Sequence, residues 1–93
     1  MAKLSDIELQ AGLKKLPGWE RKGDAIVRQF KFARFAEGIR FVDRVAELAD
    51  AADHHPDIDI RYTTLTVSLS THSEGGVTAK DLAMAERIQE LRS

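Results

Sequence analysis

Residues 50–72 read DAADHHPDIDIRYTTLTVSLSTH, and they contain the end of a helix and the strands that follow it. Proline disfavours helical backbone in the residue before it, so Pro56 predicts that the helix stops at or before His54 and that residues 57–62 are extended. In residues 64–70 apolar and polar side chains alternate, which is the pattern of a strand with one buried face. The apolar face consists of Leu65, Val67 and Leu69, and the polar face of Thr64, Thr66, Ser68 and Ser70.

Upstream of this stretch, residues 33 to about 53 predict the longest helix of the chain. Their apolar side chains recur at a helical period, and charged residues fill the remaining face. The apolar face consists of Phe35, Ile39, Val42, Val45 or Ala46, and Ala49.

Nearer the N-terminus, the pattern predicts a short helix followed by a β-hairpin. Ser5 is a typical N-cap, and Pro17-Gly18 breaks the helix, which should end near Lys15. Apolar and β-branched residues after that break are typical of strands. The hairpin consists of a strand at 19–21, a turn at 22–24 and a strand at 25–32.

A loop and a last helix complete the chain. Gly75-Gly76 predicts the loop, and Thr78-Ala79-Lys80-Asp81 resembles a capping box, in which the first and fourth residues bond to each other's backbone at a helix start. The apolar stripe of this helix is Leu82, Ala85, Ile88 and Leu91. The predicted order is αββαββα, in a single domain of residues 1–93.

The composition excludes several classes of protein. The 14 basic and 15 acidic residues give a net charge of -1 without long blocks of one sign, so no nucleic-acid surface is predicted. The absence of cysteine excludes disulfides, thiolate catalysis and Cys-type zinc sites. Residues 1–10 lack the apolar run of a secretory signal, and no stretch reaches the roughly 18 apolar residues of a membrane span. A cytoplasmic protein without membrane contact is expected.

All three histidines fall between residues 54 and 72, and histidine is the side chain that changes charge near neutral pH. Asp50 lies four residues before His54, so on a continuous helix its carboxylate would orient that imidazole. His54 and His55 lie where the helix meets a strand, and His72 has the parity of the polar face if the later strand continues that far. The three imidazoles could then converge on one cleft as proton donors and acceptors, each transfer contributing on the order of 10²- to 10⁴-fold to a rate.

A metal site is one alternative, because three histidines with a carboxylate are typical zinc ligands. Adjacent residues on extended chain point to opposite faces, however, so His54 and His55 would rarely bind one ion, and no metal is predicted.

Each candidate residue could also have a purely structural role, and the local sequence leaves open whether its role is structural or functional. These roles are a helix-end cap for His54, surface positions for His55 and His72, solvated charges for Asp50 and Asp53, the capping-box acid for Asp81, a core or interface anchor for Trp19 and a packed aromatic for Tyr62.

The joint spacing of these residues resembles the pterin-4a-carbinolamine dehydratase family over essentially the whole chain. The family's pattern is an acidic residue, three further residues, His-His-Pro, an aromatic residue, a third histidine and an aspartate. The matching positions are Asp50, His54, His55, Pro56, Tyr62, His72 and Asp81, with Leu16-Pro17-Gly18-Trp19 before the hairpin. Asp50 stands where many members have glutamate, so its carboxylate reaches less far.

The resemblance implies an α+β fold, in which a four-stranded antiparallel sheet carries three helices on one face and the chains form homodimers or homotetramers. It also implies a pterin substrate: 4a-hydroxytetrahydropterin loses water to give quinonoid dihydropterin, in support of tetrahydropterin recycling. No metal or organic cofactor is implied.

The resemblance also implies residue roles. His54 and His72 would be the principal acid–base pair, and His55 would position the substrate and assist proton transfer. Asp50, Asp53 and Asp81 would orient the imidazoles, and Trp19 would pack near the pterin. The predicted catalytic residues are therefore His54, His55, His72 and Asp81, and the predicted substrate-binding residues are Trp19, Asp50, Asp53 and His55.

Two other functions fit the same resemblance. Some animal members of the family bind a homeodomain transcription factor, so a protein-binding role is the main alternative. A pterin-related role in molybdenum-cofactor metabolism is the second. The sequence does not decide the oligomeric state, the preferred pterin side chain or which histidine is the acid.

Overall fold

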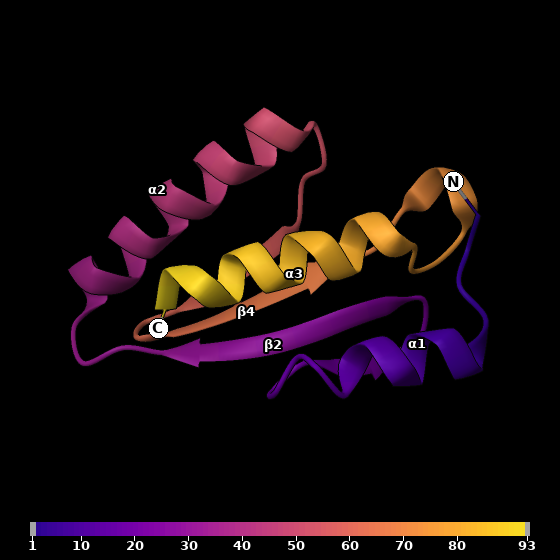
Figure 1. The fold of residues 1–93 in the computed structure, drawn as a ribbon. Coiled ribbons are helices and arrows are strands. Elements are labelled where there is room, and N and C mark those ends of the chain that lie inside the picture. The colour runs from indigo at the N-terminus through magenta and orange to yellow at the C-terminus, as the bar shows by residue number, and fades with distance from the viewer. Residues whose placement is uncertain (1, 93) are drawn as a thin grey trace.

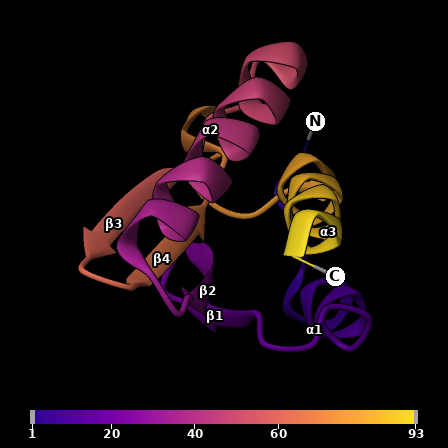
Figure 2. The ribbon, with the colours of Figure 1, turned by 90° about the vertical axis from the view of Figure 1, so that its left-hand side faces the viewer.

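A four-stranded antiparallel sheet organises residues 2–92, the part of the chain that this computed structural model describes (Figure 1). The strands lie in the order β1-β2-β4-β3, and the three helices lie on one face of the sheet (Figure 2). The elements are α1 (Asp6–Leu13), β1 (Glu20–Lys22), β2 (Ala25–Lys31), α2 (Phe35–Ala52), β3 (Asp57–Arg61), β4 (Thr64–Leu69), the 3-10 helix η1 (His72–Glu74) and α3 (Ala79–Arg92). The predicted fold class and the order αββαββα are confirmed.

The strand pairing places the apolar side chains on the face toward the helices. β2 and β4 pair with Ile26 opposite Leu69 and Phe30 opposite Leu65. Because side chains alternate between the two faces of a sheet, these four and Val67 point the same way, and each is at most 2% exposed. The helices add Leu9, Phe41, Val45, Met84 and Ile88 to this core. The predicted division of residues 64–70 into a buried and a polar face is confirmed.

The first helix begins with a capping box. The hydroxyl of Ser5 accepts a hydrogen bond from the Glu8 N–H at 3.2 Å, and the Glu8 carboxylate accepts one from the Ser5 N–H at 2.9 Å. The hydrogen bond from the Ser5 backbone holds the pKa of Glu8 below its usual value. The helix ends at Leu13, slightly before the predicted end near Lys15.

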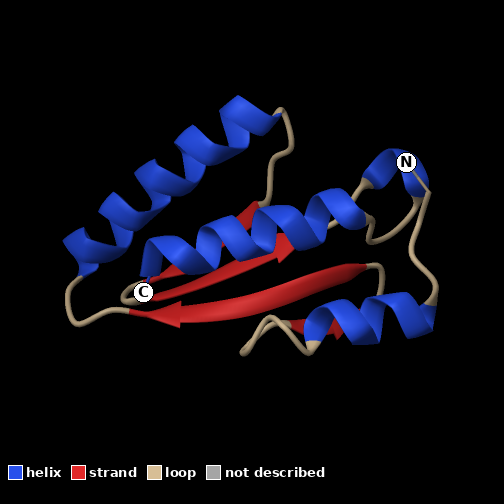
Figure 3. Ribbon diagram, in the orientation of Figure 1, coloured by secondary structure: helices blue, strands red, loops and turns tan. Residues whose placement is uncertain are grey.

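The end of α2 follows the prediction from Pro56. The helix stops at Ala52, and Asp53 caps it in the left-handed conformation with a φ of 51°. The N–H of His54 then donates to the carbonyl of Ala49 at 3.1 Å. The connection to β3, residues 53–56, is a short loop (Figure 3).

One local prediction near β4 is wrong. The sequence predicts a packed Tyr62, but this residue is 75% exposed because it forms the turn between β3 and β4 with a φ of 52°. The condition for His72 to share the polar face of β4 is not met, because β4 ends at Leu69 and His72 opens η1. A bridge between Thr71 and Gly76 closes the loop that contains η1.

Trp19 is an anchor of the core beside β1. It is 4% exposed, and its ring meets that of Phe30 edge-on with 6.2 Å between the centroids. This packing is the anchor role that the sequence left open. Among the described residues, no helix has both the length and the apolar character to cross a membrane.

Candidate active site

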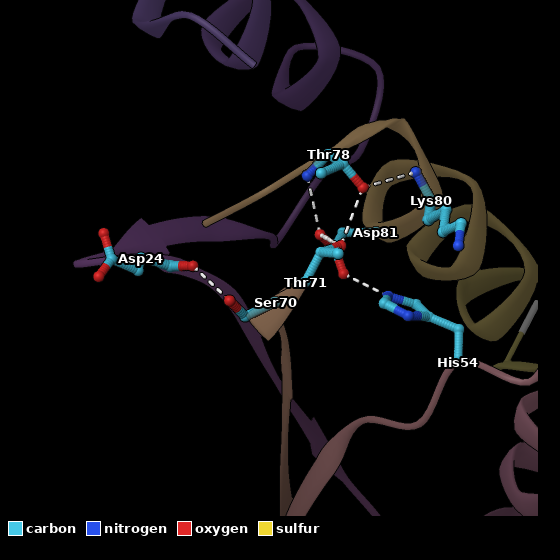
Figure 4. A network of polar contacts seen from close by, with 7 residues as sticks. All are labelled: Asp24, His54, Ser70, Thr71, Thr78, Lys80 and Asp81. Carbon is cyan, nitrogen blue, oxygen red and sulfur yellow. Dashed lines mark hydrogen bonds and ion pairs between the residues drawn. The ribbon is translucent and has the colours of Figure 1, made fainter. Parts of the chain in front are cut away.

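His54 and Asp81 form the centre of the candidate site (Figure 4). The imidazole Nε2 of His54 lies 2.5 Å from Oδ1 of Asp81, although the two residues are far apart in the sequence. The side chain of His54 is 13% exposed and that of Asp81 is fully buried. The left-handed turn at Asp53 directs His54 away from α2, and the first turn of α3 supplies Asp81. A histidine that keeps some solvent access is thereby held by a carboxylate that has none.

Two further hydrogen bonds hold the buried Asp81 carboxylate. Its Oδ2 accepts a hydrogen bond from the Thr71 hydroxyl at 2.8 Å and one from the Thr78 N–H at 2.8 Å. The bond to the Thr78 N–H is the capping-box contact that the sequence predicts. Asp81 is therefore both a helix cap and the partner of His54, so the two readings of this residue are compatible.

Asp50 does not orient His54, and this prediction is wrong. Its Oδ1 lies 2.9 Å from Nε2 of His55 instead, in an exposed ion pair. Residues four apart share a face only on a continuous helix, and α2 ends at Ala52, before it reaches His54. Exposed pairs of this kind contribute about 0–1 kcal/mol to stability, so the contact mainly restricts the His55 ring.

The other predicted residues lie farther from this centre. Asp53 is the exposed cap of α2, and His72 is exposed at the start of η1. Trp19 precedes β1 at one edge of the sheet, whereas His54 precedes β3 at the other, so the chain does not bring them together. Within residues 2–92, no hydrogen bond or ion pair joins His55 or His72 to His54.

A hollow of about 160 Å³ opens beside His54 between the end of α2 and one face of α3. Alanine and methionine side chains form much of its wall, with two basic residues among them. Its lining residues are Ala52, His54, Lys80, Ala83, Met84 and Arg87. The sequence reading missed Lys80 and Arg87, although positions 80, 83, 84 and 87 share one face of a helix.

The site shows no arrangement of metal ligands. Within residues 2–92, no group of three or more His, Cys, Asp or Glu side chains is placed to hold a metal ion. The geometry therefore lends no support to the three-histidine zinc alternative.

Comparison with known proteins identifies the family. The family model described as pterin 4 alpha carbinolamine dehydratase matches residues 2–91. A protein of Thermomicrobium roseum assigned by name to these dehydratases is 50% identical over 93 residues, which are 100% of both chains. One from Mycobacteroides abscessus is 57% identical over 88 residues, 95% of this chain and 94% of that one.

Solved structures agree with the sequence relatives. A Brucella melitensis protein, described as a transcriptional coactivator/pterin dehydratase, superposes with a TM-score of 0.95 at 35% identity, over 98% of this chain and 99% of that one. A pterin dehydratase-like protein, described as a RuBisCO assembly factor in the alpha-carboxysome, shares the fold alone, with a TM-score of 0.66 at 23% identity over 78% and 84% of the two chains. The family model and the full-length relatives show that this chain belongs to the pterin-4-alpha-carbinolamine dehydratase family.

Proposed function

We propose that this chain dehydrates 4a-hydroxytetrahydropterin to quinonoid dihydropterin and water, in support of tetrahydropterin recycling. Membership of the family over residues 2–91 supports the substrate class, and the buried pair of His54 and Asp81 is the observation that carries the chemistry. In this reaction C4a loses its hydroxyl, N5 loses its proton, and the N5–H electron pair forms the C4a=N5 double bond. An acid must protonate the departing hydroxyl, and a base must take the N5 proton.

His54 suits one of these proton transfers. The Asp81 carboxylate at 2.5 Å orients the ring and stabilises the imidazolium that forms when His54 accepts a proton. The carboxylate is surrounded by donors and fully buried, so water does not compete with the imidazole for it. The 13% exposure of the His54 side chain leaves it accessible to a ligand.

His72 is proposed for the second transfer. It is exposed at the start of η1 and directly follows Thr71, whose hydroxyl contacts Asp81. His55, restricted by its ion pair with Asp50, is proposed to position the pterin and to assist proton transfer. Asp50 would then act on His55 rather than on His54. Asp53 and Trp19 stay predicted substrate contacts on the strength of the family resemblance.

The test of this function is a stopped-flow measurement of 4a-hydroxytetrahydropterin dehydration with the purified chain. Dehydration should be faster than in buffer alone, in proportion to protein concentration. A chain that folds but does not accelerate the reaction would contradict the proposal. It would favour the alternative protein-binding role, and the Brucella melitensis structure is described as a transcriptional coactivator as well as a pterin dehydratase.

His72→Ala should lower the dehydration rate by about 10²-fold, because it removes one of the two proposed proton-transfer groups. The same change should alter the free energy of unfolding by less than about 0.5 kcal/mol, because an exposed side chain is lost. Stopped-flow rates and a urea titration measure the two effects. A variant that keeps the full rate would remove His72 from the mechanism.

We also infer that the chain forms homodimers or homotetramers in the cytoplasm. Among residues 2–92, four large apolar residues are exposed, namely Ile7, Phe35, Ile60 and Tyr62. A domain of this size buries only roughly 60–65% of its unfolded surface, so association would cover apolar area that one chain leaves open. Light scattering on the eluted protein should give a mass of at least two chains. A single-chain mass at micromolar concentration would contradict this expectation.

A further inference from the structure

Two threonines connect the loop of His72 to the buried carboxylate that holds His54. Thr71 and Thr78 are both buried, and their hydroxyl oxygens lie 2.9 Å apart. The Thr71 hydroxyl also lies 2.8 Å from Oδ2 of Asp81, and the Thr78 hydroxyl accepts the N–H of Lys80 at 3.2 Å. Figure 4 shows these contacts as one continuous network that ends at His54.

The chemistry of the groups fixes the direction of every hydrogen bond in this network. A backbone N–H only donates, an ionised carboxylate only accepts, and each threonine hydroxyl has one proton to donate. The Thr71 proton is used by Asp81, so the Thr78 hydroxyl must donate to the Thr71 oxygen. The chain therefore runs from the Lys80 N–H through Thr78 and Thr71 to Oδ2 of Asp81, and bonds aligned in this way strengthen one another.

This direction determines which nitrogen of His54 carries the proton. Oδ2 of Asp81 is occupied by Thr71 and by the Thr78 N–H, so Oδ1 faces His54 as an acceptor. Nε2 of His54 must then donate, and the neutral ring has its free lone pair on Nδ1. In Figure 4 the second ring nitrogen points away from Asp81.

We propose that Thr71 and Thr78 are positioning residues, which hold Asp81 so that His54 keeps the Nε2–H tautomer and exchanges its proton with the pterin through Nδ1. This inference rests on the proposed dehydration for its catalytic part. Its structural part concerns the free protein alone. The backbone of Thr71 adds a second function, because its N–H and carbonyl bond to Gly76 and its carbonyl also accepts the Glu74 N–H. One residue thereby fixes both the Asp81 carboxylate and the turn that carries His72.

The test compares Thr71→Val with Thr71→Ser and with Thr66→Val as a matched control. Valine keeps the shape of threonine but removes the hydroxyl, and serine keeps the hydroxyl. Thr66 lies on the opposite face of β4 from the core and takes no part in the network. Nitrogen-15 NMR of labelled histidine reports the tautomer of His54 without substrate, at a pH where the ring is neutral, and stopped-flow rates give kcat and KM.

The wild type and Thr66→Val should show the Nε2–H tautomer of His54. Thr71→Val should show a mixture of tautomers and a kcat lowered about tenfold or more, with KM nearly unchanged, because a hydrogen bond to a charged group is lost. Thr71→Ser should restore most of the Nε2–H tautomer and most of the kcat.

A wild-type Nδ1–H tautomer would overturn the proposal, even if the valine variant did not fold. So would a Thr71→Val protein with unchanged tautomer and kcat, or a serine variant that behaves like valine. A chain without dehydratase activity whose tautomer responds as expected would remove the proposed function and leave the positioning role standing.

Discussion

Replacing His54 by glutamine should lower the dehydration rate on the order of 10²- to 10⁴-fold while the protein stays folded. In the wild type, Nε2 of His54 lies 2.5 Å from Oδ1 of Asp81. The glutamine amide can donate a hydrogen bond to the same oxygen. An amide neither takes up nor releases a proton near pH 7, so the proton transfer is lost while the hydrogen bond remains. Stopped-flow rates and a thermal melt of the same preparation measure both consequences.

His54→Ala is the control that separates chemistry from structure. Alanine removes the donor as well and leaves Oδ1 of the buried Asp81 carboxylate short of a partner, which should cost about 1–3 kcal/mol of stability. We therefore expect both variants to be slow and only the alanine variant to be less stable. A glutamine variant with the wild-type rate would exclude His54 from proton transfer.

The fold was largely predictable because its elements have strong local signals. Side chains alternate between the two faces of a strand, and proline disfavours helical backbone in the residue before it. Both effects come from backbone geometry that the rest of the protein does not alter, and they apply to residues 64–70 and to His55. These signals gave the buried face of β4 and the end of α2 as the structure has them. No comparable signal marked the turn at Tyr62, because a bulky residue with positive φ is uncommon in a two-residue turn.

The partners of the histidines were not predictable from local rules. The spacing of four residues suggested Asp50 for His54, but the left-handed turn at Asp53 ends the helix before the rule applies. The actual partner, Asp81, comes from α3 and reaches His54 only through the packing of α3 beside α2. The family resemblance did single out Asp81, because the family pattern extends from Asp50 to Asp81 and does not depend on the contacts within one segment. No sequence signal marked Thr71, since a threonine gives no sign of its partners in a sequence.

Asp81→Asn should lower the dehydration rate on the order of 10²- to 10⁴-fold and also destabilise the fold by about 0.5–2 kcal/mol. The carboxylate accepts from three donors, the Thr71 hydroxyl, the Thr78 N–H and Nε2–H of His54. Asparagine has one acceptor oxygen and one donor group, so in either orientation its NH₂ meets at least one of these three donors. If the NH₂ faces His54, the imidazole must present Nε2 as an acceptor and carry its proton on Nδ1. If it faces Thr78, the cap of α3 is lost because a backbone N–H cannot reverse.

The two orientations of this asparagine give different readouts, so one variant distinguishes the two roles of Asp81. Melting temperature reports the cap, while turnover and the His54 tautomer report the site. Asp43→Asn, on the exposed face of α2, is the matched control and should change neither. A loss of stability with full turnover would mean that Asp81 acts only as the capping acid of α3, and His54 would then need no carboxylate. A loss of turnover with the Nδ1–H tautomer would instead show that the tautomer is what the buried carboxylate controls, because the ring and its neighbours remain in place.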